Sequence, residues 1–209
     1  MSRKLFHTFF VMVLIAGLVV TERAPAVRAA GPWYVSPSGD DSNDCLSPST
    51  PCATINSAIS RASSGDIVNV AEGAYTGPGS EVVRIDKNIS LSGGWDSAFS
   101  TQGGFSTVDG QSSMRGVFVA NGVAGALDRF IIRNGSFSDY GGGIYSDGDL
   151  ALSNSSIHSN SIGNFCYGGG IFFNGTSMSI ENSTVSNNHA GCNGGGVFSA
   201  QLSSTVTIN

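Results

Sequence analysis

Gly141-Gly-Gly-Ile144 returns twice in the last third of the 209-residue chain, as Gly168-Gly-Gly-Ile171 and as Gly194-Gly-Gly-Val197. The starts of these motifs lie 27 and then 26 residues apart. A fixed period in this range is typical of solenoid proteins, in which each repeat forms one coil and only stacking of the coils buries apolar side chains. The spacing therefore predicts stacked coils.

A second pattern fills the segments between the glycine triplets. Segments 150–160 and 178–188 each begin with two apolar residues at alternate positions, which is typical of a half-buried strand. Asn154 and Asn182 follow, and Asn tolerates the left-handed backbone geometry of a turn. We expect their side chains to stack across coils as a short amide ladder, which Arg129 interrupts one coil earlier.

These repeats predict an all-β protein, a parallel β-helix. Only a few side chains in each repeat are large, and most of the others are Ser, Asn, Thr or Gly, which suits a narrow coil better than an ordinary globular core. A low-complexity linker is the alternative. Linkers do not keep apolar residues in register over successive repeats, so the β-helix is the better interpretation.

The chain divides into three predicted segments. Residues 1–30 have a basic start, an apolar run and small residues before a cleavage region, which is typical of a secretory signal peptide. An uncleaved membrane anchor is the alternative, although the run is short for a membrane span. Residues 31–64 predict an N-terminal cap of a strand, a disulfide loop and an amphipathic helix over residues 53–62. Residues 65–209 predict the coils.

The last residue, Asn209, lies inside a repeat. We therefore expect the chain to be part of a longer protein. If it is complete, open strand edges predict end-to-end self-association or a frayed last coil.

The charge balance restricts the partners. Residues 1–30 contain four of the ten basic and one of the fifteen acidic residues, so the rest of the chain has a formal charge of −8. No Lys or Arg follows Arg133. Because no basic patch exists to meet phosphates, the sequence argues against a nucleic-acid or anionic-membrane partner. It also disfavours acidic polysaccharides unless a cation bridges them.

The four cysteines fit an oxidising compartment. Cys45 and Cys52 bracket a loop and predict a local disulfide. Cys166 and Cys192 each lie two residues before a glycine triplet, so they predict a disulfide between adjacent coils, whose strands are about 4.8 Å apart. A zinc site of four cysteines is the weaker alternative, because the chain has no Cys-x-x-Cys pair.

Three N-terminal motifs carry a family resemblance. Tyr34–Asp41, Ala53–Ile59 and Gly65–Tyr75 resemble the opening of right-handed parallel β-helix proteins of the pectin-lyase-like superfamily. Ser183–Ala190, which runs into the last glycine triplet, is similar to repeats of bacterial surface proteins called polymorphic outer-membrane-type. The resemblance implies a right-handed β-helix. It leaves the function open, because the superfamily includes lyases, epimerases, glycosidases and adhesins.

Two residue pairs are weak catalytic candidates. Arg129 and Arg133 could supply the base and the substrate-binding cation of a polysaccharide lyase, and solvated surface residues are the alternative. Asp147 and Asp149 could form the carboxylate pair of a glycoside hydrolase, but they flank a glycine, which more often indicates a turn.

An acidic run is a weak metal candidate. Asp40, Asp41 and Asp44 could bind calcium, although the run lacks the spacing of an EF-hand. An Asx-rich loop closed by the Cys45–Cys52 bridge is the alternative. No other cofactor is expected.

The sequence thus predicts a secreted or cell-surface scaffold without catalytic activity, which serves adhesion or contact with a glycan or a surface. We expect an extracellular polysaccharide or a cell-surface component as its partner, and no membrane span once the signal peptide is removed. The alternative is a carbohydrate-active enzyme, either a polysaccharide lyase or a glycoside hydrolase.

Overall fold

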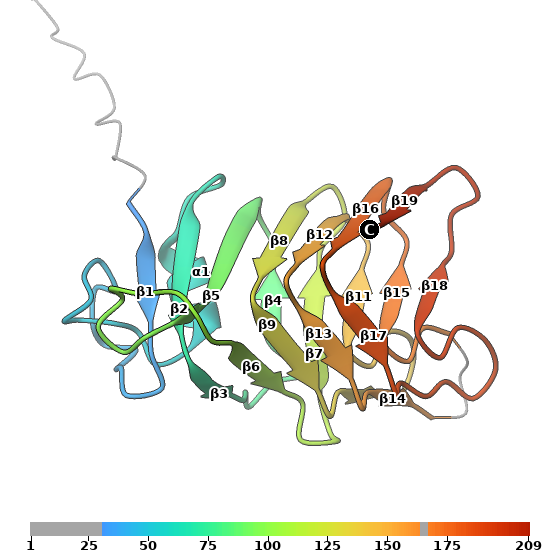
Figure 1. Cartoon of the computed structure of the whole chain (residues 1–209), viewed down its shortest axis with the longest axis horizontal. Coiled ribbons are helices and arrows are strands. Elements are labelled where there is room, and N and C mark those ends of the chain that lie inside the picture. The colour runs from blue at the N-terminus through green and yellow to red at the C-terminus, as the bar shows by residue number, and fades with distance from the viewer. Residues whose placement is uncertain (1–30, 164–166) are drawn as a thin grey trace, which may run out of the picture.

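A computed structural model describes residues 31–163 and 167–209, which form a parallel β-helix (Figure 1). Three sheets run along the axis of the coils. The first sheet contains β1 (Trp33–Val35), β2 (Ile67–Ala71), β5 (Ile89–Trp95), β8 (Ala124–Asp128), β12 (Asp149–Ser153), β16 (Ser177–Glu181) and β19 (Thr205–Ile208). The second contains β4 (Glu81–Ile85), β7 (Arg115–Val119), β11 (Ile144–Ser146), β15 (Ile171–Phe173) and β18 (Val197–Ser199). The third contains β3 (Gly73–Tyr75), β6 (Ser106–Asp109), β9 (Phe130–Arg133), β13 (Ser156–His158) and β17 (Thr184–Ser186).

Each strand of these sheets pairs in parallel with its equivalent in the next coil. Leu150 lies opposite Met178 and Leu152 opposite Ile180, while Ile144 lies opposite Ile171. This register stacks like residues inside the coils, where all of them are at least 98% buried. Each such side chain contributes about 1.5–3 kcal/mol through burial. The predicted parallel β-helix is confirmed.

The predicted turns are also confirmed. Arg129, Asn154 and Asn182 have φ angles of 60°, 48° and 48°, so all three adopt the left-handed conformation. At the second predicted turn, Gly141 has a φ of 61°. A Cβ atom on Gly143 would lie 2.5 Å from the carbonyl oxygen of Gly170, so the triplets also permit close approach of adjacent coils.

The amide ladder lies at a different position from the predicted one. The Nδ2 group of Asn154 donates to the Asp128 carboxylate over 2.7 Å, and among the described residues no hydrogen bond joins the side chains of Asn154 and Asn182. The ladder is formed six residues further on, where Asn160 donates from Nδ2 to Oδ1 of Asn188 over 2.9 Å. Asn160 is 99% buried, whereas Asn154 is half-buried at a corner of the coil and meets a charged neighbour there. The prediction of a ladder at Asn154 and Asn182 was therefore wrong.

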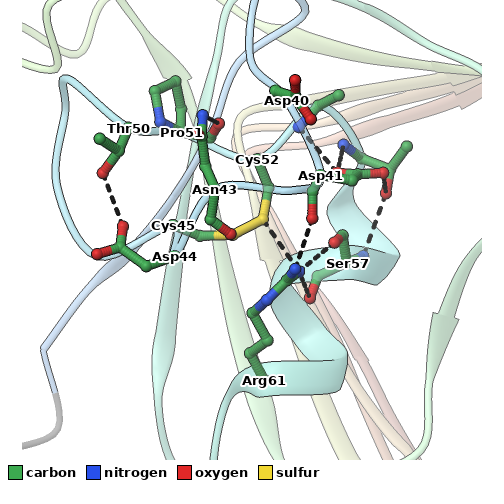
Figure 2. The surroundings of a disulfide bond; sticks show 12 residues. Asp40, Asp41, Asn43, Asp44, Cys45, Thr50, Pro51, Cys52, Ser57 and Arg61 are labelled. Atoms are coloured by element: carbon green, nitrogen blue, oxygen red, sulfur yellow. Dashed lines mark hydrogen bonds between the residues drawn. A yellow bond between two sulfur atoms is a disulfide. The ribbon is translucent and has the colours of Figure 1, made fainter.

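The N-terminal cap contains helix α1 (Ile55–Arg61), which packs against β1, β2 and β4. Its N-cap, Thr54, accepts a hydrogen bond from the Ser57 backbone N–H. The Cys45–Cys52 disulfide lies beside the helix, and both cysteines are fully buried (Figure 2). This bridge is confirmed. Cys166 lies outside the described residues, so the bond to Cys192 stays a prediction.

The remaining two strands, β10 (Ser136–Phe137) and β14 (Ser161–Ile162), form a separate two-stranded parallel sheet. The predicted signal peptide, residues 1–30, lies outside the described part of the chain. Within residues 31–163 and 167–209, no helix has the length and apolar character needed to cross a membrane.

Candidate functional site

The outer face of the first sheet carries a groove. Small side chains form its floor in successive strands, where Ser90, Ala126, Ala151 and Ser179 lie opposite one another in register. A hollow of about 290 Å³ lies over this floor, and a second of about 350 Å³ lies at the corner between the second and first sheets. The two hollows adjoin, and together they are called the groove here; they share three lining residues, Asn88, Ala124 and Asp149.

Glycines at the corner explain why the groove is open. Gly148 and Gly175 occupy equivalent turns in adjacent coils, and both line the groove. A Cβ atom on Gly148 would lie 2.1 Å from the Val123 carbonyl oxygen, and one on Gly175 would lie 2.2 Å from the Gly148 carbonyl oxygen. No side chain fits between these turns, so only the flanking polar side chains rise around the hollow.

Asp147 and Asp149 line this corner, and hydrogen bonds from the same and the next coil fix one oxygen of each. Oδ1 of Asp147 accepts hydrogen bonds from the Tyr145 hydroxyl and from Nδ2 of Asn174, both over 3.0 Å. Oδ1 of Asp149 accepts from the Thr176 hydroxyl over 2.7 Å and from the Ser177 backbone N–H over 2.8 Å. Among the described residues, neither Oδ2 atom has a hydrogen-bond donor.

These hydrogen bonds determine the ionisation of the site. Those from the Thr176 side chain and the Ser177 backbone hold the pKa of Asp149 below its ordinary value, although partial burial opposes them. Asp149 is therefore an anion at neutral pH. Burial, together with the bond to Asp147, raises the pKa of Tyr145 to about 12, so this hydroxyl stays protonated and continues to donate. The corner thus presents acceptors to a ligand that carries hydroxyl or ammonium donors.

The structure does not bring the two candidate arginines to this groove. Arg129 lies in the left-handed turn after β8, with Nε 3.8 Å from Oδ2 of Asp128. Arg133 ends β9 on the third sheet, with Nε 3.0 Å from Oδ2 of Asp109. Each arginine therefore pairs with its own carboxylate on a different element, and neither is among the residues that line the groove.

The acidic run of the cap binds backbone groups of its own loop and of the start of α1 (Figure 2). Asp41 accepts from the backbone N–H groups of Ala53 and Thr54, both over 2.9 Å. Asp40 accepts from the Ser42 N–H, and Asp44 accepts from the Leu46 N–H and the Thr50 hydroxyl. These bonds lower the pKa of Asp40 and of Asp44.

These contacts are those of an Asx-rich loop. In the described part of the chain, no group of three or more His, Cys, Asp or Glu residues could hold a metal ion. Calcium binding by Asp40, Asp41 and Asp44 stays an untested expectation.

Sequence reasoning missed a file of aromatic rings on the outer face of the second sheet. Phe118, Tyr145, Phe172 and Phe198 stack along four successive coils, with ring centroids 5.6, 5.2 and 5.7 Å apart. Arg115 lies beside these rings, with its guanidinium carbon 4.8 Å from the centroid of the Tyr145 ring and 3.9 Å from that of the Phe137 ring. The signal was present in the sequence, because an aromatic residue follows the β-branched residue after each glycine triplet.

The comparisons with known proteins add nothing to the description of this site. No family model matches the sequence, and no curated protein matches it significantly. A solved structure titled rhamnogalacturonan lyase is similar to 85% of this chain at 12% sequence identity, with a TM-score of 0.31. The chain spans 62% of that lyase, which is less than two thirds of its length. No activity follows from a likeness of this degree.

Proposed function

We propose that this protein is a secreted or cell-surface β-helix scaffold that contacts an extracellular glycan through the groove of the first sheet. The groove, and above all its hollow over the first sheet, carries the proposal. It crosses four neighbouring strands, from β5 to β16, a distance of about 14 Å at ordinary strand spacing. Such a path suits an extended polymer.

The chemistry of the lining fits the same ligand. Amides, hydroxyls and carboxylates border the corner, and small side chains form the floor, so a sugar chain could lie flat and find hydrogen-bond partners on one side. The Cys45–Cys52 disulfide agrees with an oxidising, extracellular location.

A carbohydrate-active enzyme is the second candidate, because Asp147 and Asp149 line the same hollow. In a glycoside hydrolase, one carboxyl group of the pair must donate a proton. The lowered pKa of Asp149 suits the ionised member of such a pair, so the acid role would fall to Asp147. Oδ1 of Asp147 already accepts hydrogen bonds from Tyr145 and Asn174, and these contacts support binding better than proton donation. Release of new reducing ends from any polysaccharide by the folded protein would favour the enzyme instead.

The scaffold proposal is tested by filling the groove. Ala151 is exposed on its floor, so Ala151→Trp would place a large ring in the path of a glycan. We expect at least tenfold weaker binding to the immobilised polysaccharides that the wild-type protein retains. Ser186→Trp, on an exposed position of β17 in the third sheet, is the matched control and should change binding less than twofold. Wild-type protein that binds none of a broad panel of glycans would refute the proposal.

A further inference from the structure

We propose that Asp147 and Asp149 form a charge-selective saccharide subsite, which favours amino sugars, accepts neutral sugars and rejects uronates. The inference rests on the proposed glycan-binding function and adds the class of sugar. Its starting point is the difference between the two oxygens of each carboxylate. Oδ1 is bound by Tyr145 of the same coil or by residues of the next coil, and Oδ2 has no donor among the described residues.

The two carboxylates are held in position before any ligand arrives. Asn174 and Tyr145 hold Asp147, while Thr176 and Ser177 hold Asp149. Their side chains therefore lose little rotamer freedom when a sugar binds, which improves affinity without further contacts. Both residues line one hollow of about 350 Å³, which is large enough for a saccharide ring.

The charge at this corner is not neutralised by the lining. No Lys or Arg is among the residues that line either hollow. The Arg115 guanidinium exerts some field on Asp147, but it donates to the carbonyl oxygens of Gly141 and Tyr140. A uronate would bring a third negative charge to two carboxylates. An ammonium group would instead form charge-assisted hydrogen bonds, which are about twice as strong as neutral ones.

The test compares three oligosaccharides that differ in charge. A glucosamine oligomer, its N-acetylated counterpart and an oligogalacturonate are titrated calorimetrically into the wild-type protein at low and at high salt. We expect the amine to bind at least tenfold more tightly than the uronate, and added salt to narrow this ratio. The double variant Asp147→Asn/Asp149→Asn keeps the size of both side chains and should bring the amine-to-uronate ratio to within about twofold of unity.

Two further variants make the result independent of folding damage. Asn121→Lys adds a cation to the lining without replacing either carboxylate, and it should strengthen uronate binding at least fivefold. Asp128→Asn removes one charge outside the lining, at the far end of β8, and should leave the amine-to-uronate affinity ratio at its wild-type value.

Two results would overturn the subsite but leave the scaffold proposal standing. One is glycan binding by the wild-type protein with an amine-to-uronate affinity ratio near unity. The other is a double variant whose affinity ratio equals that of the wild-type protein. Absence of binding to all three sugars and to the wider glycan panel would overturn both.

Discussion

The outer faces of the first and second sheets use the same coils in opposite ways. On the second sheet, the rings of Phe118, Tyr145, Phe172 and Phe198 stack on one another, with interplanar angles of 5°, 9° and 17°. On the first sheet, small side chains leave a groove. A stacked ring has both of its faces occupied, so it contributes to stability and presents only its edge to a ligand. The face with small side chains contributes little packing, but it leaves room for a partner.

One hydrogen bond connects the aromatic rings of the second sheet to the groove of the first sheet. The Tyr145 hydroxyl, at the end of a ring in the aromatic file, donates to Asp147 in the groove over 3.0 Å. Packing on the second sheet therefore positions a polar group of the candidate site. The comparison teaches that stability and recognition are divided between faces of the same coil, and this division can be measured.

The largest expected effect is on the aromatic file. Phe172 is 94% buried between Tyr145 and Phe198 and also stacks on Tyr140, so Phe172→Ala removes three ring contacts and opens a cavity. We expect a loss of about 3–5 kcal/mol in the free energy of unfolding, measured by urea denaturation. Ser179→Ala on the first sheet is the matched control and should change it by no more than about 0.5 kcal/mol. Equal losses in the two variants would contradict the division between the faces.

The sequence predicts the inward side of this molecule better than its outward side. Inward residues such as Leu152 and Ile180 follow a strict alternation, and glycine triplets can be placed because few other residues adopt their backbone geometry. Phe172 lies between Ile171 and Phe173, and in such an apolar run the alternation does not show which side chains point outward to stack across coils.

For the residues at the corner of the coil, the sequence does not show which polar atoms are buried or bound. The repeats over residues 150–160 and 178–188 each contain an Asn after their first strand and another six residues later, and only the path of the turn decides which amide is buried. Likewise, Asp147 and Asp149 could be named as a pair from the sequence. Which of their oxygens stays open depends on Asn174 and Thr176 in the next coil, about 27 residues away.

The second prediction concerns the buried amide ladder. Asn160 accepts from the Gly135 backbone N–H over 2.8 Å and donates to the carbonyl oxygen of Ile132 over 3.0 Å. Asn160→Ala removes both buried hydrogen bonds and leaves the Gly135 N–H without this acceptor, so we expect a loss of about 2–3 kcal/mol in thermal or urea unfolding. Asn154→Ala, at the half-buried corner, should lose only about 1 kcal/mol. A smaller loss at Asn160 than at Asn154 would show that the ladder does not hold the coils together.

The third prediction concerns the bond between the two faces, and it is a pH dependence. Because the pKa of Tyr145 is raised to about 12 from an ordinary value of 10.0, the unfolded state ionises first as the pH rises. The stability from the protonated hydroxyl is therefore fully present below pH 10 and is lost as the pH rises towards 12. Tyr145→Phe should cost about 1 kcal/mol at neutral pH and make the alkaline loss shallower.

A second tyrosine provides the control for this profile. Burial also raises the pKa of Tyr75, whose hydroxyl donates to the Ala71 carbonyl oxygen inside the coil. Tyr75→Phe should likewise make the alkaline loss shallower, but it should leave glycan binding unchanged because Tyr75 lies away from the groove. If Tyr145→Phe leaves the alkaline profile identical to that of the wild-type protein, the hydroxyl of Tyr145 is not held protonated by Asp147 and by burial.

The smallest expected effect is at the N-terminal end of the aromatic file. There the Arg84 guanidinium, in the coil before Phe118, lies where a further stacked ring would be. The guanidinium carbon of Arg84 lies 4.5 Å from the Phe118 centroid, and the same side chain pairs with Glu81 over 2.8 Å. Arg84 is about half exposed, so a double-mutant cycle of Arg84→Ala with Phe118→Leu should give a coupling of about 0.5–1 kcal/mol. The cycle of Arg84→Ala with Glu81→Gln should give less, about 0.3–0.5 kcal/mol, and should weaken with salt because exposed ion pairs are screened. The coupling between Arg84 and Phe118 could instead vanish at high salt together with the ion pair. In that case Arg84 would be held by Glu81 alone, and the row of stacked groups would end at Phe118.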